Sequence, residues 1–152
     1  MNRNYGYQFA YNNDGSGFEE CAEDYRGPEA FSEPETAAMR DFLIDHPEVK
    51  VALNFHAYGP LLIIPYNWDP GHGNRQLPTK AQKFYQDVYK KVPKSYLLGN
   101  GVTTIGYTAN GEASDWMLHE LGIYAASPEL GINDRHTDTF FISNIASLTK
   151  LI

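Results

Sequence analysis

Residues 49–56 alternate between apolar and more polar side chains and then end on a histidine. In the stretch VKVALNFHAYGP, which begins at Val49, the odd-numbered positions up to 55 are valine, valine, leucine and phenylalanine. An extended chain directs alternate side chains to opposite faces, so these four lie on one face and His56 lies on the other. Gly59 and Pro60 follow, and both are typical of turns. The pattern predicts a β-strand that presents His56 at its carboxyl end.

Helical and extended patterns alternate along the rest of the chain. The expected helices are residues 32–46, 78–92 and 114–121, and the expected strands are residues 49–56, 61–66, 101–107 and 122–130. Two capping boxes, Ser32 with Glu35 and Thr79 with Gln82, support the first two helices. The region before the first helix is rich in glycine, asparagine and aromatic residues, which is typical of a long irregular loop. The alternation predicts an α/β fold with a mostly parallel sheet.

The composition is that of a globular protein, and it excludes two classes of partner. The chain has 152 residues, of which 42% are hydrophobic, enough for the core of one domain or of a piece of a larger one. A net charge of −7, with no basic cluster beyond residues 89–94, argues against nucleic acid. No apolar run is long enough to cross a membrane. Cys21 is the only cysteine, so it is either a reduced thiol or half of a disulfide whose other half is missing.

Two polar side chains stand where predicted strands end. His56 closes one strand, and Glu129 follows the apolar segment IYAAS and Pro128. Ligands of open α/β sheets gather beyond the carboxyl ends of strands, where a histidine can bind a metal or act as a base. A buried glutamate there needs a cation or a function to offset its desolvation. The alternatives are a hydrogen-bonded structural histidine and a solvated loop carboxylate.

Arg3 and Tyr107 are candidates for binding a ligand. Arg3, which lies between Asn2 and a second asparagine, offers a planar set of donors that suits a carboxylate. Tyr107 precedes a loop of small residues able to carry a phenol into and out of a site, and a half-buried aromatic is the alternative. The metalloprotease pattern His-Glu-x-x-His is absent, and His119 and Glu120 are expected on a helix surface.

Several short motifs, taken in order, resemble the zinc metallocarboxypeptidases of the A/B type. They are NRNYGY, GSG, YRGPEAFSEPET, FHAYG, IGYTANGEASDW and SPEL, and together they cover nearly the whole chain. The resemblance implies a mixed, mostly parallel central sheet with helices on both faces. It also implies a zinc-dependent exopeptidase that removes the C-terminal residue of peptides, in a secreted, extracellular, lysosomal or vacuolar location, with any export signal outside this chain.

The resemblance implies a role for individual residues. His56 matches a ligand of Zn²⁺. Glu129 matches the general base that acts on water activated by the zinc. Asn2 and Arg3 match the pair that holds the terminal carboxylate of the substrate, and Tyr107 matches the mobile tyrosine that closes over it.

Three further positions concern the side chain of the substrate. Tyr58 matches a subsite tyrosine near the ligand. Ser114 falls where A-type enzymes have an apolar residue and B-type enzymes an acidic one, so a neutral serine argues against strong selection for lysine or arginine. Glu112 stands where the family usually has glycine, and it leaves the preference of this pocket open.

The family's other two zinc ligands, a His-x-x-Glu pair, lie upstream of the Asn-Arg element, as does the disulfide partner of the cysteine that Cys21 matches. We therefore expect residues 1–152 to be the carboxyl-terminal part of a single zinc carboxypeptidase catalytic domain. Since catalytic zinc needs three protein ligands, we expect this chain alone neither to bind Zn²⁺ tightly nor to hydrolyse peptides.

A non-catalytic carboxypeptidase-like module that binds peptide C-terminal carboxylates is the alternative function. Glu129 weighs against it, because a pure binder has no use for an acidic base beside an anionic ligand. The expected partner in both cases is the C-terminus of a peptide or protein.

Overall fold

Strands and helices are interleaved along the chain, as expected for an α/β fold. The computed structural model describes residues 1–71 and 76–131. The elements are α1 (Pro34–Asp45), β1 (Val51–Leu53), β2 (Leu61–Ile63), α2 (Thr79–Tyr89), β3 (Leu97–Gly99), α3 (Gly101–Thr104), α4 (Ala113–Leu121) and β4 (Tyr124–Glu129). Within the described part of the chain, no helix has the length and apolar character needed to span a membrane.

The four strands form one sheet in the order β1-β4-β2-β3. β1 runs parallel to β4, with Val51 beside Tyr124, and β2 runs parallel to β3. β2 and β4 are antiparallel, with Leu62 beside Pro128. The expectation of a mixed, mostly parallel sheet is therefore confirmed. β4 lies between two neighbours and its interior residues are buried, as in a central strand.

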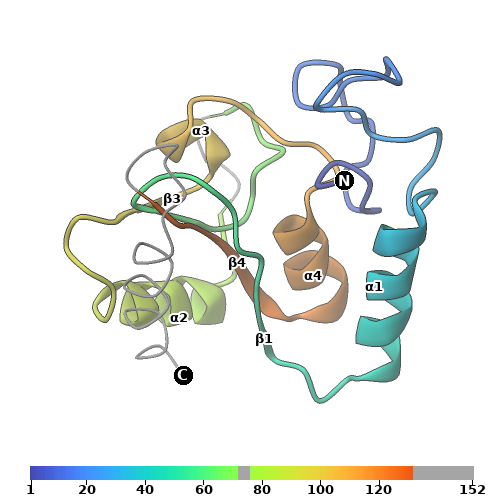
Figure 1. Ribbon diagram of the computed structural model, residues 1–152. Helices are drawn as coiled ribbons and strands as arrows, with labels where there is room; N and C mark the ends of the chain where they lie inside the picture. The colour runs from blue at the N-terminus through green and yellow to red at the C-terminus, as the bar shows by residue number, and fades with distance from the viewer. Residues whose placement is uncertain (72–75, 132–152) are drawn as a thin grey trace.

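Helices cover both sides of this sheet, as Figure 1 shows, with α1 and α4 to one side and α2 to the other. Trp116 and Met117 of α4 are buried in the main hydrophobic core. Tyr85 of α2 is 1% exposed, and its hydroxyl donates a hydrogen bond to the carbonyl oxygen of Ala125 in β4 at 2.7 Å. The central strand is thus held from both faces.

The prediction of a strand over residues 101–107 is wrong, because a helix cap acts there. The Oδ1 of Asn100 accepts a hydrogen bond from the backbone N–H of Thr103 at 3.1 Å, which starts α3. The capping box proposed at Thr79 is also absent: Pro78 precedes α2, and no side chain caps that helix. At residues 101–107, the hydrogen bond from the cap therefore outweighs the strand preference of the β-branched residues.

The capping box proposed at Ser32 does not form, because that hydroxyl has other partners. Ser32 Oγ donates to Oε1 of Glu33 at 2.9 Å and accepts from Nδ2 of Asn4 at 2.9 Å. Asn4 is fully buried, and its Nδ2 also donates to the carbonyl oxygens of Arg26 at 2.6 Å and Glu29 at 2.9 Å. Asn4 thereby fastens the irregular N-terminal region to the start of α1.

Candidate active site

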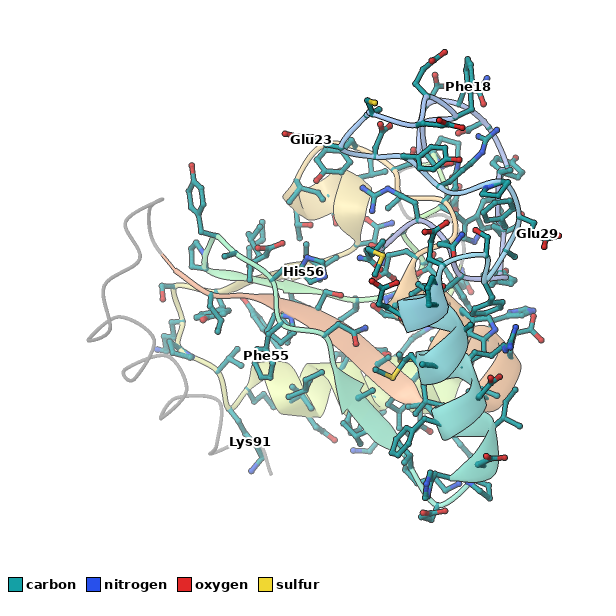
Figure 2. All side chains as sticks on the ribbon, turned by 45° about the vertical axis from the view of Figure 1, so that its right-hand side comes forward. Phe18, Glu23, Glu29, Phe55, His56 and Lys91 are labelled. Atoms are coloured by element: carbon teal, nitrogen blue, oxygen red, sulfur yellow. The ribbon has the colours of Figure 1, made fainter. Side chains whose placement is uncertain are left out.

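The ends of β1 and β4 bring His56 and Glu129 together. The two residues form an isolated parallel bridge beyond β1. The amide of His56 donates to the carbonyl oxygen of Pro128 at 3.0 Å, and the amide of Leu130 donates to that of His56 at 2.8 Å. Phe55 and His56 lie on opposite sides of the chain in Figure 2, and Phe55 is 53% exposed. The alternation noted in the sequence thus turns His56 toward Glu129.

The N-terminal segment places Asn2 against His56. The Nδ2 of Asn2 lies 3.4 Å from Nε2 of His56 and donates to Oε1 of Glu112 at 3.2 Å. The Oδ1 of Asn2 accepts from the amide of Ala113 at 3.0 Å. Nη1 of Arg3 donates to the carbonyl oxygen of Asn2 at 2.6 Å. Asn2 therefore joins the end of β1 to the start of α4 and orients the neighbouring guanidinium.

A close backbone approach fixes the position of Arg3. The amide of Tyr5 donates to the carbonyl oxygen of Gly111 at 2.9 Å. Gly111 has φ of 63°, and a Cβ atom there would lie 2.5 Å from the carbonyl oxygen of Arg3. Glycine is required at this position, because a side chain would meet backbone atoms in a conformation that already disfavours it.

Asn2, Arg3, His56 and Glu129 line one cavity, which has a volume of 100 Å³. The lining residues are Asn2, Arg3, His56, Ile63, Asn67, Gly101, Ile105, Tyr107, Ala109, Glu112, Ser127 and Glu129. Two of the residues proposed from the sequence lie elsewhere: Tyr58 is 55% exposed, and Ser114 is fully buried with its Oγ 2.9 Å from Oε1 of Glu112. A larger cavity of 370 Å³ beside α2 has no acidic or basic side chain among its described lining residues.

Two buried polar atoms of this site have no hydrogen-bond partner within the described residues. They are Nε of Arg3 and Oε2 of Glu129. Burial raises the pKa of Glu129 above its ordinary value, and the nearby His56 opposes that shift. Buried polar groups are nearly always hydrogen-bonded, because leaving them unpaired is costly. The site therefore offers a donor to an anion at Arg3 and a proton acceptor at Glu129.

A buried polar network that the sequence did not reveal supports the site. Ser127 Oγ donates to Oε1 of Glu112 at 3.2 Å, and Asn67 Nδ2 donates to its Oε2 at 3.2 Å. Asp115 is fully buried; burial and then the charge of Glu112 raise its pKa, whereas hydrogen bonds from Asn67 oppose this. Ser127 could have been found, because it precedes Glu129 by two residues and so shares its face of β4. Asn67 lies outside any regular element and gives no such signal.

The described residues do not form a zinc site on their own. Among the residues that the structure describes, His56 is the only histidine that lines the cavity. No group of three histidine, cysteine, aspartate or glutamate side chains suited to a metal occurs within residues 1–71 and 76–131. Catalytic zinc sites use three protein ligands, so further ligands would be needed beside His56.

The family model of the zinc carboxypeptidases matches residues 1–148. The chain belongs to the zinc carboxypeptidase family. Human carboxypeptidase A5 is 36% identical to this chain over 133 residues, which cover 86% of the chain and 30% of the relative. Human carboxypeptidase B is 33% identical over 119 residues, which cover 76% of the chain and 28% of the relative. The chain thus spans about three tenths of the length of these relatives.

Solved structures agree with the fold of this chain. Bovine thrombin-activatable fibrinolysis inhibitor, in complex with tick carboxypeptidase inhibitor, matches with a TM-score of 0.77 and 22% identity, over 99% of this chain and 54% of that chain. Carboxypeptidase A from Helicoverpa armigera matches with a TM-score of 0.66 and 26% identity, over 99% and 37% respectively. The chain therefore has a carboxypeptidase fold and covers part of it.

Proposed function

We propose that residues 1–152 are the carboxyl-terminal part of the catalytic domain of a zinc-dependent exopeptidase that removes the C-terminal residue of peptides. One observation carries the proposal: Arg3 Nε and Glu129 Oε2 are buried in one cavity and lack partners among the described residues. A peptide C-terminus supplies an anion for the first group. It also carries, next to that anion, a peptide bond whose hydrolysis requires a base such as the second.

Arg3 binds the terminal carboxylate of the peptide. A guanidinium presents parallel N–H donors that match the two oxygens of a carboxylate. The hydrogen bond from Nη1 to the carbonyl oxygen of Asn2 orients these donors and leaves Nε available. Tyr107 lines the cavity yet is 53% exposed, so its hydroxyl is free to turn toward the same carboxylate. The demand for a terminal anion makes the reaction that of an exopeptidase.

Glu129 acts as the general base. Its carboxylate, half-buried beside His56, accepts a proton from the attacking water and returns it to the leaving amine. His56 serves as one ligand of Zn²⁺, and the other ligands come from outside the described residues. When bound, the metal lowers the pKa of water and polarises the peptide carbonyl.

A non-catalytic module that binds C-termini is the second candidate. It is favoured by the lack of a three-ligand metal group among the residues that the structure describes. Such a module would use Arg3 and Tyr107 in the same way, and Glu129 would have no role in it.

Binding of matched peptides tests the carboxylate site. We would titrate the 152-residue chain with an N-blocked dipeptide and with its C-terminal amide, using calorimetry. The free acid is expected to bind at least about tenfold more tightly, because charge-assisted hydrogen bonds to Arg3 are lost with the amide. Arg3→Gln should abolish this difference. Arg40→Gln makes the same change at an exposed ion pair with Asp41 and should preserve it.

Release of C-terminal residues separates the two candidates. In the native protein, release that stops with a chelator and returns with Zn²⁺ supports the exopeptidase. Preference for the free acid without any release supports the binding module. Equal binding of acid and amide by the wild-type chain would contradict both.

A further inference from the structure

The cavity contains a buried carboxylate that no cation neutralises among the described residues. Glu112 is 3% exposed, yet it precedes a helix and lines the cavity. Its carboxylate accepts hydrogen bonds from the side-chain amides of Asn2 and Asn67, the hydroxyls of Ser114 and Ser127, and the amide of Asp115. All of these donors are neutral. The ion pairs within residues 1–71 and 76–131 involve other carboxylates, on the surface.

A second carboxyl group, that of Asp115, lies close enough to Glu112 for the two to interact electrostatically. Asp115 is fully buried and accepts hydrogen bonds from the amides of Asn67 and Trp68. It has no ion pair among the described residues either. Arg3 lines the same cavity as Glu112, but in the proposed function its charge is matched by the terminal carboxylate of the peptide. Once a peptide is bound, the charge of Glu112 therefore remains unbalanced, and a buried charge without a partner is costly.

The shape of the cavity suits a long side chain with a charged tip. Ile63, Ile105 and Ala109 supply apolar wall beside Glu112 and Ser127. Lysine and arginine pack their methylene stems on apolar surface and carry their charge at the end. The volume of 100 Å³ corresponds to roughly seven to ten water-sized positions, at 10–15 Å³ for each. The number of these positions is comparable with the number of non-hydrogen atoms in either side chain.

A second cavity beside this one is also acidic. This neighbouring cavity of 430 Å³ shares Asn2, Arg3 and Tyr107 with the first, and its lining adds three acidic residues, Asp14, Glu23 and Asp24. Figure 2 shows Glu23 in the irregular N-terminal region above His56. The three carboxylates of this second cavity outnumber its one guanidinium, and a concave surface of net negative charge attracts cationic ligands.

We propose that Glu112 makes this cavity selective for peptides whose C-terminal residue is lysine or arginine. The inference rests on the proposed function, which places the C-terminal residue of the peptide in this cavity. Ser114, at the position compared with B-type enzymes, is neutral, but its hydroxyl donates to Glu112. The acidic group is thus supplied two residues earlier in the chain.

The test compares peptides that differ only in the charge of the last side chain. Arginine and citrulline are nearly equal in size and shape, and citrulline is neutral. N-blocked dipeptides ending in arginine, citrulline and glutamate, each as free acid and as amide, would be titrated into the full chain. The arginine acid is expected to bind at least about tenfold more tightly than the citrulline acid, and the glutamate acid most weakly.

Variants assign the selectivity to Glu112. In Glu112→Gln the arginine-to-citrulline ratio should fall close to one. The double variant Glu112→Gln, Ser114→Asp returns a carboxylate to the neighbouring position and should restore the preference. A ratio unchanged by Glu112→Gln would overturn the assignment. Because Glu112 also caps α4, the glutamine variant is compared only if it folds; the wild-type panel tests the selectivity independently, and arginine no better than citrulline would overturn the proposal.

The outcomes separate this inference from the proposed function. Acids that bind better than amides, with arginine no better than citrulline, would leave the C-terminus site standing and reduce Glu112 to a helix cap. Acids and amides that bind equally well would overturn the proposed function and the selectivity together.

Discussion

The backbones of His56 and Glu129 pair in an isolated parallel bridge, so the imidazole and the carboxylate are held side by side by strand register. Side chains alternate along a strand, and a slip of β1 by one residue would turn His56 away from the cavity. Their proximity therefore follows from the pairing of β1 with β4, in which Val51 lies beside Tyr124. The proposed active site is an outcome of sheet geometry.

Gly111→Ala is expected to destabilise the protein by about 2–4 kcal/mol and to abolish preference for a free C-terminal carboxylate. Its Cβ would lie 2.5 Å from the carbonyl oxygen of Arg3, a backbone atom that cannot move without displacing the guanidinium. Gly106→Ala is the matched control, because Gly106 also has positive φ but nothing lies within 4 Å of its Cβ position. It should cost about 1 kcal/mol in urea unfolding and keep binding intact. Equal effects of the two variants would contradict the role given to Gly111.

Asn4→Ala should lower the free energy of unfolding by about 2–3 kcal/mol. The substitution leaves the carbonyl oxygens of Arg26 and Glu29 without the donor that the fully buried Asn4 supplies. Asn13→Ala, at an exposed asparagine of the same loop region, should change stability by less than about 0.5 kcal/mol. Chemical denaturation measures both, and a mild effect of Asn4→Ala would show that other contacts hold the N-terminal region.

Alkaline pH should destabilise the protein through Tyr85. Burial raises the pKa of this phenol, followed by the charges of Asp115 and Glu112. Its stabilising contribution is complete below the unfolded pKa of about 10 and is lost as the pH rises from there toward the higher folded value. Tyr85→Phe should cost about 1 kcal/mol at neutral pH, through the lost hydrogen bond to Ala125, and should flatten the fall in stability above pH of about 10.

The control for this prediction is Tyr89→Phe, which removes a hydroxyl from the same helix at a residue that is 36% exposed. Thermal unfolding recorded across the alkaline range compares the two variants. A decline in Tyr85→Phe as steep as in the wild type would assign the alkaline sensitivity to other groups.

Zinc titration of the 152-residue chain is expected to give a dissociation constant weaker than about 1 µM. His56 is the sole histidine that lines the described cavity, and one imidazole holds the metal weakly. The weak binding that remains should fall in His56→Asn and persist in His46→Asn, which alters a histidine on the surface. Tighter binding that depends on His56 would mean that the chain supplies further ligands.

The sequence predicted the parts of the fold that depend on local pattern. Alternation identified the strand that leads to His56, although its regular part, β1, ends at Leu53. The helix expected over residues 114–121 is present as α4, and Gly122, which has φ of 65°, closes it. The sequence-based prediction failed at residues 101–107, where β-branched residues indicated a strand but the side chain of Asn100 starts a helix. It failed again at Ser32, whose hydroxyl is bound by Asn4 from a distant part of the chain.

The site could be predicted only where residues follow strands or carry a recognisable motif. His56, Glu129 and Arg3 were named for those reasons, and all three line the cavity. Burial of Glu112 against Asn2 depends on contact between residues 110 positions apart, and no local pattern reports such a contact. Its proposed part in selectivity is therefore an inference from the tertiary structure.

The contact between Asn2 and Glu112 also links binding of a ligand in the cavity to the stability of the folded state. One wall includes Asn2 and Arg3, and the opposite wall lies far along the sequence, so displacement of the segment that carries Asn2 would open the cavity. A peptide bound to both Arg3 and Glu112 would hold the two walls together. By mass action, each tenfold rise in the concentration of such a ligand above its dissociation constant adds about 1.4 kcal/mol to the folded state. At equal peptide concentration, the melting temperature would then be highest for the peptide whose C-terminal residue binds most tightly.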